Sequence, residues 1–257
     1  MILVDTHTHL YLDDFDADWR EVVDSAIESG VKYMLLPRID SETFEDQKKL
    51  SEFYPDNCLS MVGLHPTSVN ADFEKELVII ENELRSSHYV AIGEIGIDLY
   101  WDQTFKEQQK EAFRRQLIWA KEFELPVSIH MRDSFNEIYQ IVKEEKTSAL
   151  NGIFHCFTGT QEESKKIIEL GFKMGLGGIL TFKNAGLAEV VKDIPMEHLV
   201  LETDAPFLSP VPCRGKRNES KYLVHIAEKL AEIKGITLTE VAEMTTANAA
   251  SVFKLKI

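Results

Sequence analysis

This chain has few cysteines and no long apolar stretch. The three cysteines among its 257 residues are Cys58, Cys156 and Cys213, and no two of them have the CxxC spacing. This argues against a disulfide framework and against a zinc site made of thiolates, and it favours a reducing cytoplasm. No apolar run approaches the length of a membrane-spanning helix, and the short apolar start lacks a basic segment before it. We therefore expect neither a membrane span nor a signal peptide.

Basic residues are also scarce. The chain has 28 lysines and arginines against 43 aspartates and glutamates, which gives a formal net charge of −15. A surface of this charge offers no general attraction for nucleic acid. No GxGxxG motif opens a helix after the first apolar run, which counts against a dinucleotide-binding fold.

The apolar residues recur in short runs separated by stretches of helical pattern. With 44% hydrophobic residues the chain can bury a full core, and without a linker, low-complexity segment or internal repeat we expect one domain over residues 1–257. Eight strands alternating with helices predict an α/β fold whose parallel sheet closes into a (β/α)8 TIM barrel, with a doubly wound open sheet as the alternative. The expected strands are Ile2–Val4, Lys32–Leu36, Cys58–Val62, Tyr89–Ile92, Pro126–Ile129, Gly152–Phe154, Phe172–Leu176 and Leu199–Leu201.

Helical periodicity is clearest in two of the intervening segments. Asp16–Ser29 and Gln103–Phe123 each place their apolar residues on one face. Gly30 and Gly171 follow such helices, at positions where a left-handed residue commonly ends a helix. A ninth helix, near Thr239–Phe253, is expected to pack across the outside of the barrel.

Two histidines stand at the end of the first expected strand, in the segment Asp5-Thr-His7-Thr-His9. Side chains alternate between the faces of a strand, so Asp5, His7 and His9 are predicted to point the same way. Two neutral imidazoles side by side form half of a site for a first-row divalent metal. The alternative is a pair of hydrogen-bonded histidines without a metal.

The barrel fold would bring further residues to the same end of the molecule, because active sites of such barrels lie at the carboxyl ends of the strands. Five of the eight histidines and three carboxylates follow expected strands. The set is His7, His9, His65, Glu94, His130, His155, Glu202 and Asp204. The remaining histidines, His88, His198 and His225, are assigned no role.

This mixture of donors suits hydrolysis with divalent metals. Imidazoles and carboxylates together favour zinc, manganese, iron or cobalt, whereas magnesium takes mostly oxygen ligands. A carboxylate central among four histidines can bridge two ions, and two neighbouring cations stabilise both the attacking and the leaving oxygen of a displacement. We expect two divalent ions, with zinc, manganese or magnesium as the candidates.

Six motifs in order along the chain resemble one known family. They are Val4-Asp-Thr-His-Thr-His-Leu10, Gly63-Leu-His-Pro66, Gly93-Glu-Ile-Gly-Ile-Asp98, Pro126-Val-Ser-Ile-His-Met-Arg132, Phe154-His-Cys-Phe-Thr-Gly159 and Leu201-Glu-Thr-Asp-Ala-Pro-Phe207. This pattern is similar to that of the TatD family of metal-dependent deoxyribonucleases, which belongs with the amidohydrolase-type metal barrels. The similarity runs from Ile2 to about Phe253, and Glu94 stands where many of those barrels carry a carboxylated lysine.

The resemblance implies a role for each matching residue. One metal would be held by His7, His9, Glu94 and Asp204, and Asp204 would also accept the proton of the nucleophilic water. The second metal would be held by Glu94, His130 and His155, with Glu94 bridging. Two further carboxylates, Glu202 and Asp5, are candidates for orienting a ligand, and for Asp5 a buried hydrogen bond is an equal alternative.

Contacts to a substrate are expected in the loops on the same face. His65, Arg132, Lys216 and Arg217 are the candidates for gripping a phosphate, although Lys216 and Arg217 also suit an exposed loop. The family shows Asn-Glu-Pro after this basic loop, whereas Asn218 is followed here by Glu and Ser. The missing proline leaves the loop backbone less restrained.

Three neighbouring features each leave two interpretations open. Arg38 suits either an anion contact or a salt bridge. Tyr100 and Trp101 suit either stacking on an unpaired base or covering the core. Cys156 adjoins a ligand, but strand alternation predicts a core thiol that points away from the site.

Hydrolysis follows from the predicted site, and DNA as the substrate follows from the resemblance. The leading hypothesis is a deoxyribonuclease that removes nucleotides from single-stranded 3′ ends, with no obligate protein partner. A hydrolase of a small ester, lactone, amide or aminoacyl ester is the second hypothesis, and the charge of −15 favours it somewhat. A binding protein on an inherited barrel is the third, and it would predict a damaged site, whereas no expected ligand is missing.

Overall fold

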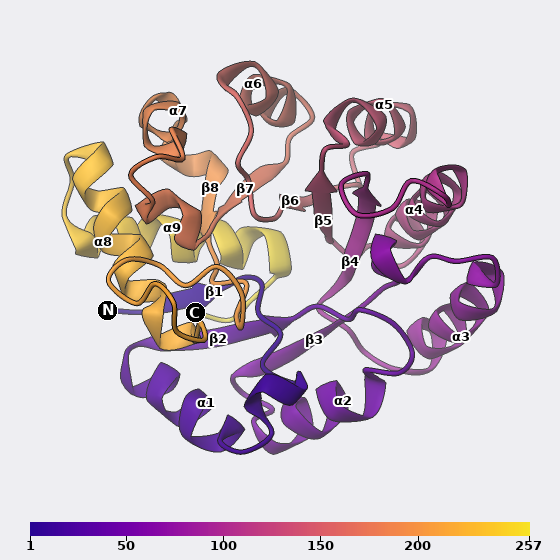
Figure 1. Cartoon of the computed structure of the whole chain (residues 1–257), viewed down its shortest axis with the longest axis horizontal. Helices are drawn as coiled ribbons and strands as arrows, with labels where there is room; N and C mark the ends of the chain where they lie inside the picture. The colour runs from indigo at the N-terminus through magenta and orange to yellow at the C-terminus, as the bar shows by residue number, and fades with distance from the viewer.

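Eight parallel strands surround the centre of the molecule in the computed structural model, which describes residues 1–257 (Figure 1). They follow one another around the sheet in chain order, which confirms the predicted (β/α)8 barrel and excludes the doubly wound sheet, whose strand order reverses. The strands are β1 (Leu3–Asp5), β2 (Val31–Leu36), β3 (Cys58–Val62), β4 (Ala91–Asp98), β5 (Val127–Arg132), β6 (Gly152–Phe154), β7 (Lys173–Leu176) and β8 (Leu199–Leu201).

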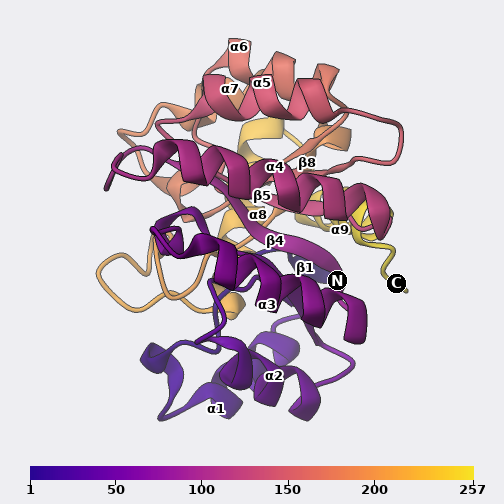
Figure 2. The same ribbon diagram turned by 90° about the vertical axis from the view of Figure 1, so that its right-hand side faces the viewer.

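The helices that connect the strands form an outer ring (Figures 1 and 2). Gly30 and Gly171 have φ values of +94° and +75°, so both follow their helices in the left-handed region, as the sequence predicts. No helix is long and apolar enough to cross a membrane. The ring comprises α1 (Trp19–Glu28), α2 (Phe44–Phe53), α3 (Phe73–Ser86), α4 (Lys106–Glu122), α5 (Phe135–Glu145), α6 (Gln161–Glu169), α7 (Leu187–Asp193) and α8 (Leu223–Lys234).

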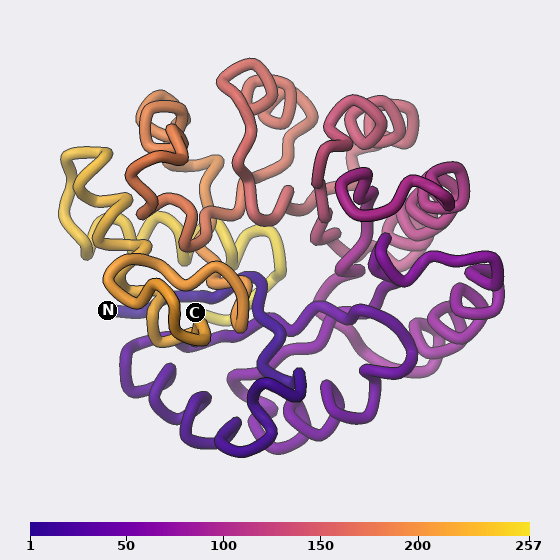
Figure 3. Tube along the Cα trace, viewed as in Figure 1, coloured from indigo at the N-terminus to yellow at the C-terminus, as the bar shows by residue number.

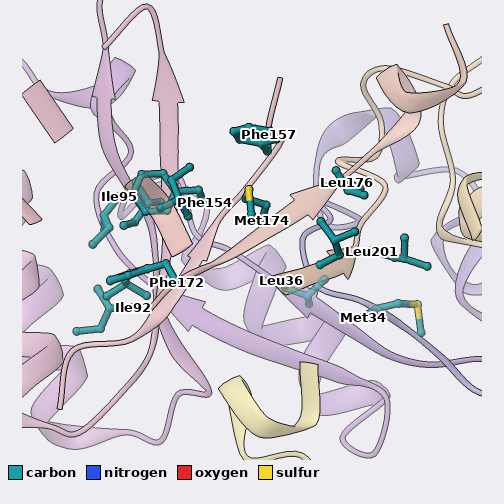
Figure 4. Close-up of a cluster of buried hydrophobic side chains, with 14 of the residues drawn as sticks. Met34, Leu36, Ile92, Ile95, Phe154, Phe157, Phe172, Met174, Leu176 and Leu201 are labelled. Carbon is teal, nitrogen blue, oxygen red and sulfur yellow. The ribbon is translucent and has the colours of Figure 1, made fainter. Parts of the chain in front are cut away.

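The main apolar core lies between the strands and this ring. Alternate strand residues point outward to fill it, and Figure 4 shows the contributions of several strands side by side. The labelled residues are Met34, Leu36, Ile92, Ile95, Phe154, Phe157, Phe172, Met174, Leu176 and Leu201. Inward-pointing strand residues form a second, smaller cluster, which includes Leu35, Met61 and Val200.

The last helix, α9 (Leu238–Phe253), closes the amino-terminal end of the barrel, so the expectation that it packs across the outside is wrong. Its residues Ala249, Val252 and Phe253 are buried against the inward-pointing strand residues of the smaller cluster. An open barrel end would expose those apolar side chains to water, and the helix removes them from it. Figure 2 shows α9 and both termini at one end, opposite the long loop between β8 and α8.

This loop, residues 202–219, contains no helix or strand and can be followed as the orange part of the trace in Figure 3. It lies beside the segment that follows β1, because the His9 N–H donates to the Ala205 carbonyl and the Asp204 N–H donates to the His7 carbonyl. The first and last strands of the barrel therefore continue into loops that are hydrogen-bonded to each other.

Phe253→Ala should destabilise the protein strongly. Phe253 is 3% exposed, and truncating a buried phenylalanine leaves a cavity that costs about 3–5 kcal/mol. The free energy of unfolding, measured by denaturant titration, should fall by about that amount. Met244→Ala in the same helix, at a side chain that is 40% exposed, should change it by less than about 0.5 kcal/mol. Equal effects of the two substitutions would contradict the closing role of α9.

Candidate metal centre

The residues expected at the carboxyl ends of the strands meet in one buried cluster. His7 and His9 follow β1, Glu94 lies in β4, and Asp204 follows β8; none of the four is more than 9% exposed. His155, directly after β6, is 4% exposed. Burying so many polar groups is costly unless they share partners, so the cluster indicates a functional site.

Glu94 occupies the middle of this cluster, and its two carboxylate oxygens face different histidines. Oε1 lies 2.7 Å from His130 Nδ1 and 2.7 Å from His155 Nε2. Oε2 lies 3.1 Å from His7 Nε2 and 3.4 Å from His9 Nε2. Each carboxylate oxygen thus faces its own pair of imidazoles, which is the arrangement that a bridging ligand requires. The His7 and His155 rings of the two pairs stack on each other, with centroids 3.7 Å apart.

Asp204 lies on the side of the first pair. Its Oδ1 is 3.9 Å from His7 Nε2 and 3.7 Å from His9 Nε2. Burial raises the pKa of Asp204 to about 6, against the opposing effect of His155 and His9. Its φ of +58° places it in the left-handed region, where residues other than glycine are uncommon and where strain often accompanies function.

Hydrogen bonds on the far sides of His7 and His9 orient both rings. His7 Nδ1 lies 3.0 Å from Ser128 Oγ, and His9 Nδ1 lies 3.0 Å from the Tyr11 hydroxyl. The Tyr11 hydroxyl donates to the Pro37 carbonyl at 2.6 Å, so it accepts from His9. His9 therefore carries its proton on Nδ1, and the lone pair of Nε2 points towards Glu94 and Asp204. A ring held in this way is prepared to bind a cation.

Tyr11→Phe should weaken metal binding without emptying the centre. The change removes the acceptor of the His9 Nδ1–H, and losing such an outer partner typically costs 10- to 100-fold in metal affinity, so about that loss is expected. Calorimetric titration of the metal-free protein with Zn²⁺ or Mn²⁺ measures it. Tyr33→Phe removes a hydroxyl that donates to the Lys256 carbonyl far from the site, and its titration should match the unchanged protein. Unaltered affinity in Tyr11→Phe would contradict this role.

Glu202 and Asp5 both lie next to the cluster. Glu202 is fully buried, accepts the Cys156 N–H, and has Oε1 3.5 Å from His155 Nδ1. A Cβ at Gly175 would stand 2.0 Å from Glu202 Oε2, so only glycine leaves room for this carboxylate. Asp5 accepts both the N–H and the hydroxyl of Thr203, at 2.8 and 2.6 Å, and so joins the ends of β1 and β8.

Two residues take places that the sequence did not assign to them. His65, expected as a phosphate contact, has Nε2 3.3 Å from Glu94 Oε1 and 3.3 Å from His130 Nδ1, so it lies among the possible ligands. Asp98 was not singled out, yet its Oδ2 accepts from His130 Nε2 at 2.9 Å. Asp98 is four residues after Glu94 in β4 and therefore shares its face, but the strand expected from the sequence ended at Ile92, so alternation did not point to it.

The donor set fits divalent cations. Three groups of donors lie close enough to share an ion: His7 with His155 and Asp204, His7 with His9 and Glu94, and His65 with Glu94 and His130. Burial alone would raise the pKa of Glu94, but the surrounding imidazoles lower it well below its usual range. Burial together with His155 lowers the pKa of His7, which keeps that imidazole neutral and able to donate a lone pair.

Of the cationic side chains expected to contact the substrate, some are free and one is paired. Arg132 and Lys216 are exposed and form no ion pair. Arg217 contacts both oxygens of Asp18 at 2.8 and 2.7 Å and also contacts Glu219, so the expected phosphate contact is not supported for this residue. The ion pair between Arg217 and Asp18 joins the long loop to the start of α1. It is bidentate, a geometry in which a guanidinium matches a carboxylate.

The structure also bears on the three interpretations that the sequence left open. Arg38 is fully buried and forms a salt bridge with Glu83 outside the barrel. Tyr100 and Trp101 are 54% and 70% exposed, so they do not cover the core. Cys156 is half-buried with a φ of +47°, and burial and the nearby charge of Asp204 raise the pKa of its thiol. The prediction that this thiol packs in the core away from the site is wrong, because the left-handed backbone breaks the strand alternation.

A barrel with histidines and carboxylates clustered at the carboxyl ends of its strands defines the class of metal-dependent hydrolases. Residues 4–254 match the family described as TatD related DNase. The chain belongs to the TatD family and is a metal-dependent hydrolase.

Several relatives extend this comparison. A metal-dependent hydrolase of Bacillus subtilis, YabD, is 41% identical over 255 residues, which cover 99% of this chain and all of that protein. A protein of Rahnella named 3′-5′ ssDNA/RNA exonuclease TatD is 34% identical, with 94% of each chain covered. The crystal structure of YjjV, a TatD homologue from Escherichia coli, has a TM-score of 0.91 at 27% identity and covers 98% of its own length and 99% of this chain.

Proposed function

We propose that this protein hydrolyses phosphodiester bonds of DNA at single-stranded 3′ ends, with two divalent ions in its buried centre. The observation that carries the proposal is the position of Glu94, whose two oxygens face two separate pairs of imidazoles. A single ion would need only one of these pairs of imidazoles and one carboxylate oxygen. Two cations suit a phosphodiester in particular, because both the attacking and the leaving oxygen carry negative charge.

The proposed ligands follow from the two pairs. His7, His9, Glu94 and Asp204 would hold one ion, and Glu94 with His130 and His155 would hold the other. When bound, the cations would acidify a water molecule and offset the charge of the phosphate. His65 is proposed as a further ligand of the second ion, because its Nε2 lies 3.3 Å from Glu94 Oε1.

The side chains of the protein do the rest of the work. Asp204 accepts the proton of the attacking water, a role that suits a carboxylate whose pKa burial raises to about 6. Asp98 holds His130 in position through a hydrogen bond, and Glu202 lies 3.5 Å from His155 Nδ1. Arg132, two residues beyond His130 in β5, and Lys216 in the long loop are free to contact the phosphate.

Two considerations bear on the substrate. The Rahnella relative is named as a nuclease for single-stranded DNA and RNA, which supports a nucleic acid. The net charge of −15 favours the second candidate, a small ester or phosphoester, because long nucleic acids bind through many basic contacts. A strand end needs few such contacts, so the local charge of the centre is sufficient for it.

The test combines metal analysis with a substrate panel. The protein is loaded in turn with Zn²⁺, Mn²⁺ and Mg²⁺, its metal content is measured, and it is given end-labelled single-stranded DNA, duplex DNA and a panel of small esters. We expect two ions per chain, loss of activity on chelation, and stepwise shortening of single strands from the 3′ end. Turnover of small esters with no cleavage of DNA would overturn the nuclease proposal, and one ion per chain would overturn the two-metal proposal.

A further inference from the structure

Two aromatic side chains stand exposed directly after β4, at the end of the barrel that holds the metal centre. Tyr100 and Trp101, directly after β4, are 54% and 70% exposed, although rings of this size are normally largely buried. Their rings meet edge to face, with centroids 5.0 Å apart and an angle of 86°. The guanidinium of Arg132 lies 4.0 Å from the centre of the Tyr100 ring and 5.2 Å from that of Trp101.

This corner is connected directly to the metal centre. Asp98 accepts the Tyr100 N–H at 3.0 Å and the Trp101 N–H at 3.3 Å through Oδ1, while its Oδ2 accepts from His130 at 2.9 Å. One carboxylate thus fixes both the backbone that carries the two aromatic rings and a proposed metal ligand. The Leu99 N–H also donates to the Arg132 carbonyl at 3.0 Å, which holds the two strands together at this point. The position of the corner relative to the centre is therefore set by hydrogen bonds.

The chemistry of the corner matches a nucleotide. Arg132 forms no ion pair, although the chain has 43 acidic residues that compete for its 28 lysines and arginines. An unpaired guanidinium beside two exposed rings presents one cation for a phosphate and flat apolar faces for a base. A base in a duplex is already stacked and paired, so such a corner selects unpaired bases, and it tolerates every base because each has a flat face.

We propose that Tyr100, Trp101 and Arg132 form a stacking corner for the terminal base of a single-stranded substrate and so confer its preference for unpaired ends. This inference rests on the proposed nuclease function and adds the group that recognises the base. These three residues determine specificity: they contact the base, and the metal centre carries out the hydrolysis.

The decisive experiment pairs a change in the protein with a change in the substrate. Trp101→Ala and the double variant Tyr100→Ala with Trp101→Ala are compared with the unchanged protein on two oligonucleotides, one ordinary and one with an abasic 3′ terminal residue. Losing one stacked base should raise KM for the ordinary strand by about 5- to 100-fold and leave kcat within about threefold. The unchanged protein should show the same loss on the abasic strand, and the double variant should show little further loss there.

Binding is followed separately from activity by tryptophan fluorescence. In the metal-loaded protein with an oligonucleotide whose 3′ terminal linkage is a non-hydrolysable phosphate analogue, the exposed Trp101 should be quenched on stacking. Trp101→Phe should lose that quenching but keep its affinity within about threefold, because a ring remains. Phe53→Ala, which removes an aromatic side chain of similar exposure at the end of α2, should keep KM and the quenching caused by the oligonucleotide, while the unbound signal shifts because Phe53 contacts Trp19.

The outcomes are distinct for the two proposals. If no nucleic acid is cleaved by the unchanged, metal-loaded protein, the proposed function fails. If DNA is cleaved, but the variants have the KM of the unchanged protein and the abasic strand has the KM of the ordinary strand, only the stacking corner is overturned. Losses that are equal on both oligonucleotides would also overturn it, since they would show a structural effect that does not depend on the base.

Discussion

Glu94→Gln should reduce hydrolysis by at least about a thousandfold and lower the metal content of the protein. The amide is neutral and offers only one acceptor oxygen, so it cannot place an oxygen before each pair of imidazoles as the carboxylate does. Stabilisation by a bridging pair of cations is worth several kcal/mol, and every 1.36 kcal/mol is a factor of ten in rate. Metal content by plasma mass spectrometry and initial rates on single-stranded DNA measure the two effects.

A control separates the loss of the bridge from the loss of a partly buried carboxylate elsewhere. Glu83→Gln removes a carboxylate that pairs with the fully buried Arg38 outside the barrel. That variant is expected to be less stable but to bind the normal amount of metal. A Glu94→Gln protein with normal metal content and activity would overturn the bridging arrangement.

Asp204→Asn should retain much of the metal while turnover falls by about 100- to 10,000-fold, the usual contribution of a positioned general base. His7, His9 and Glu94 remain in place, so the cluster still offers three donors to the first ion. Asparagine is chosen because it tolerates the φ of +58° that Asp204 adopts, and the backbone should therefore stay unchanged.

The readouts for Asp204→Asn are kcat, KM and metal occupancy in one preparation. KM should change little, since the groups that bind the substrate remain, and raising the pH should not restore the rate, because an amide cannot accept the proton at any pH. Asp133→Asn, an exposed position with a φ of +52°, provides the matched stability control. Full occupancy with turnover within about threefold of the unchanged protein would remove the base assignment.

The sequence predicts the framework of the centre well because its signals are local. A short apolar run followed by a histidine or carboxylate marks a strand end wherever it occurs, and the barrel fold then brings all such ends together. The strands Cys58–Val62, Gly152–Phe154 and Leu199–Leu201 match their predicted bounds. The six ligands proposed from the motifs meet in one cluster for this reason.

The sequence predicts less where burial does not follow hydrophobicity. The fourth strand was expected at Tyr89–Ile92 but runs Ala91–Asp98, because Glu94 and Asp98 are buried by the site that they build. An apolar run cannot signal such a strand. Asp98 escaped notice for that reason, and its contact with His130 became visible only when β4 and β5 were placed side by side.

Ion pairs between residues far apart in the chain could not be predicted from the sequence either. Arg217 stands in a basic loop, and nothing near it in the sequence shows that Asp18, 199 positions earlier, will take both of its amino groups. The same holds for His65, which was assigned to the substrate but contacts Glu94. A side chain in a loop has no periodicity from which its direction can be read, so only the folded structure assigns its partner.

The hydrogen bonds between the first and last strands of the barrel have a consequence for how the protein folds during synthesis. Asp5 is hydrogen-bonded to Thr203, and the segment after β1 to the loop after β8, so the proposed first ion takes donors from residue 7 and from residue 204. During synthesis the early histidines leave the ribosome long before their final partner. The nascent chain therefore lacks one of the four proposed donors to the first ion, Asp204, until its last fifth emerges, and cations that bind only the finished site would stabilise the completed chain over its unfinished forms.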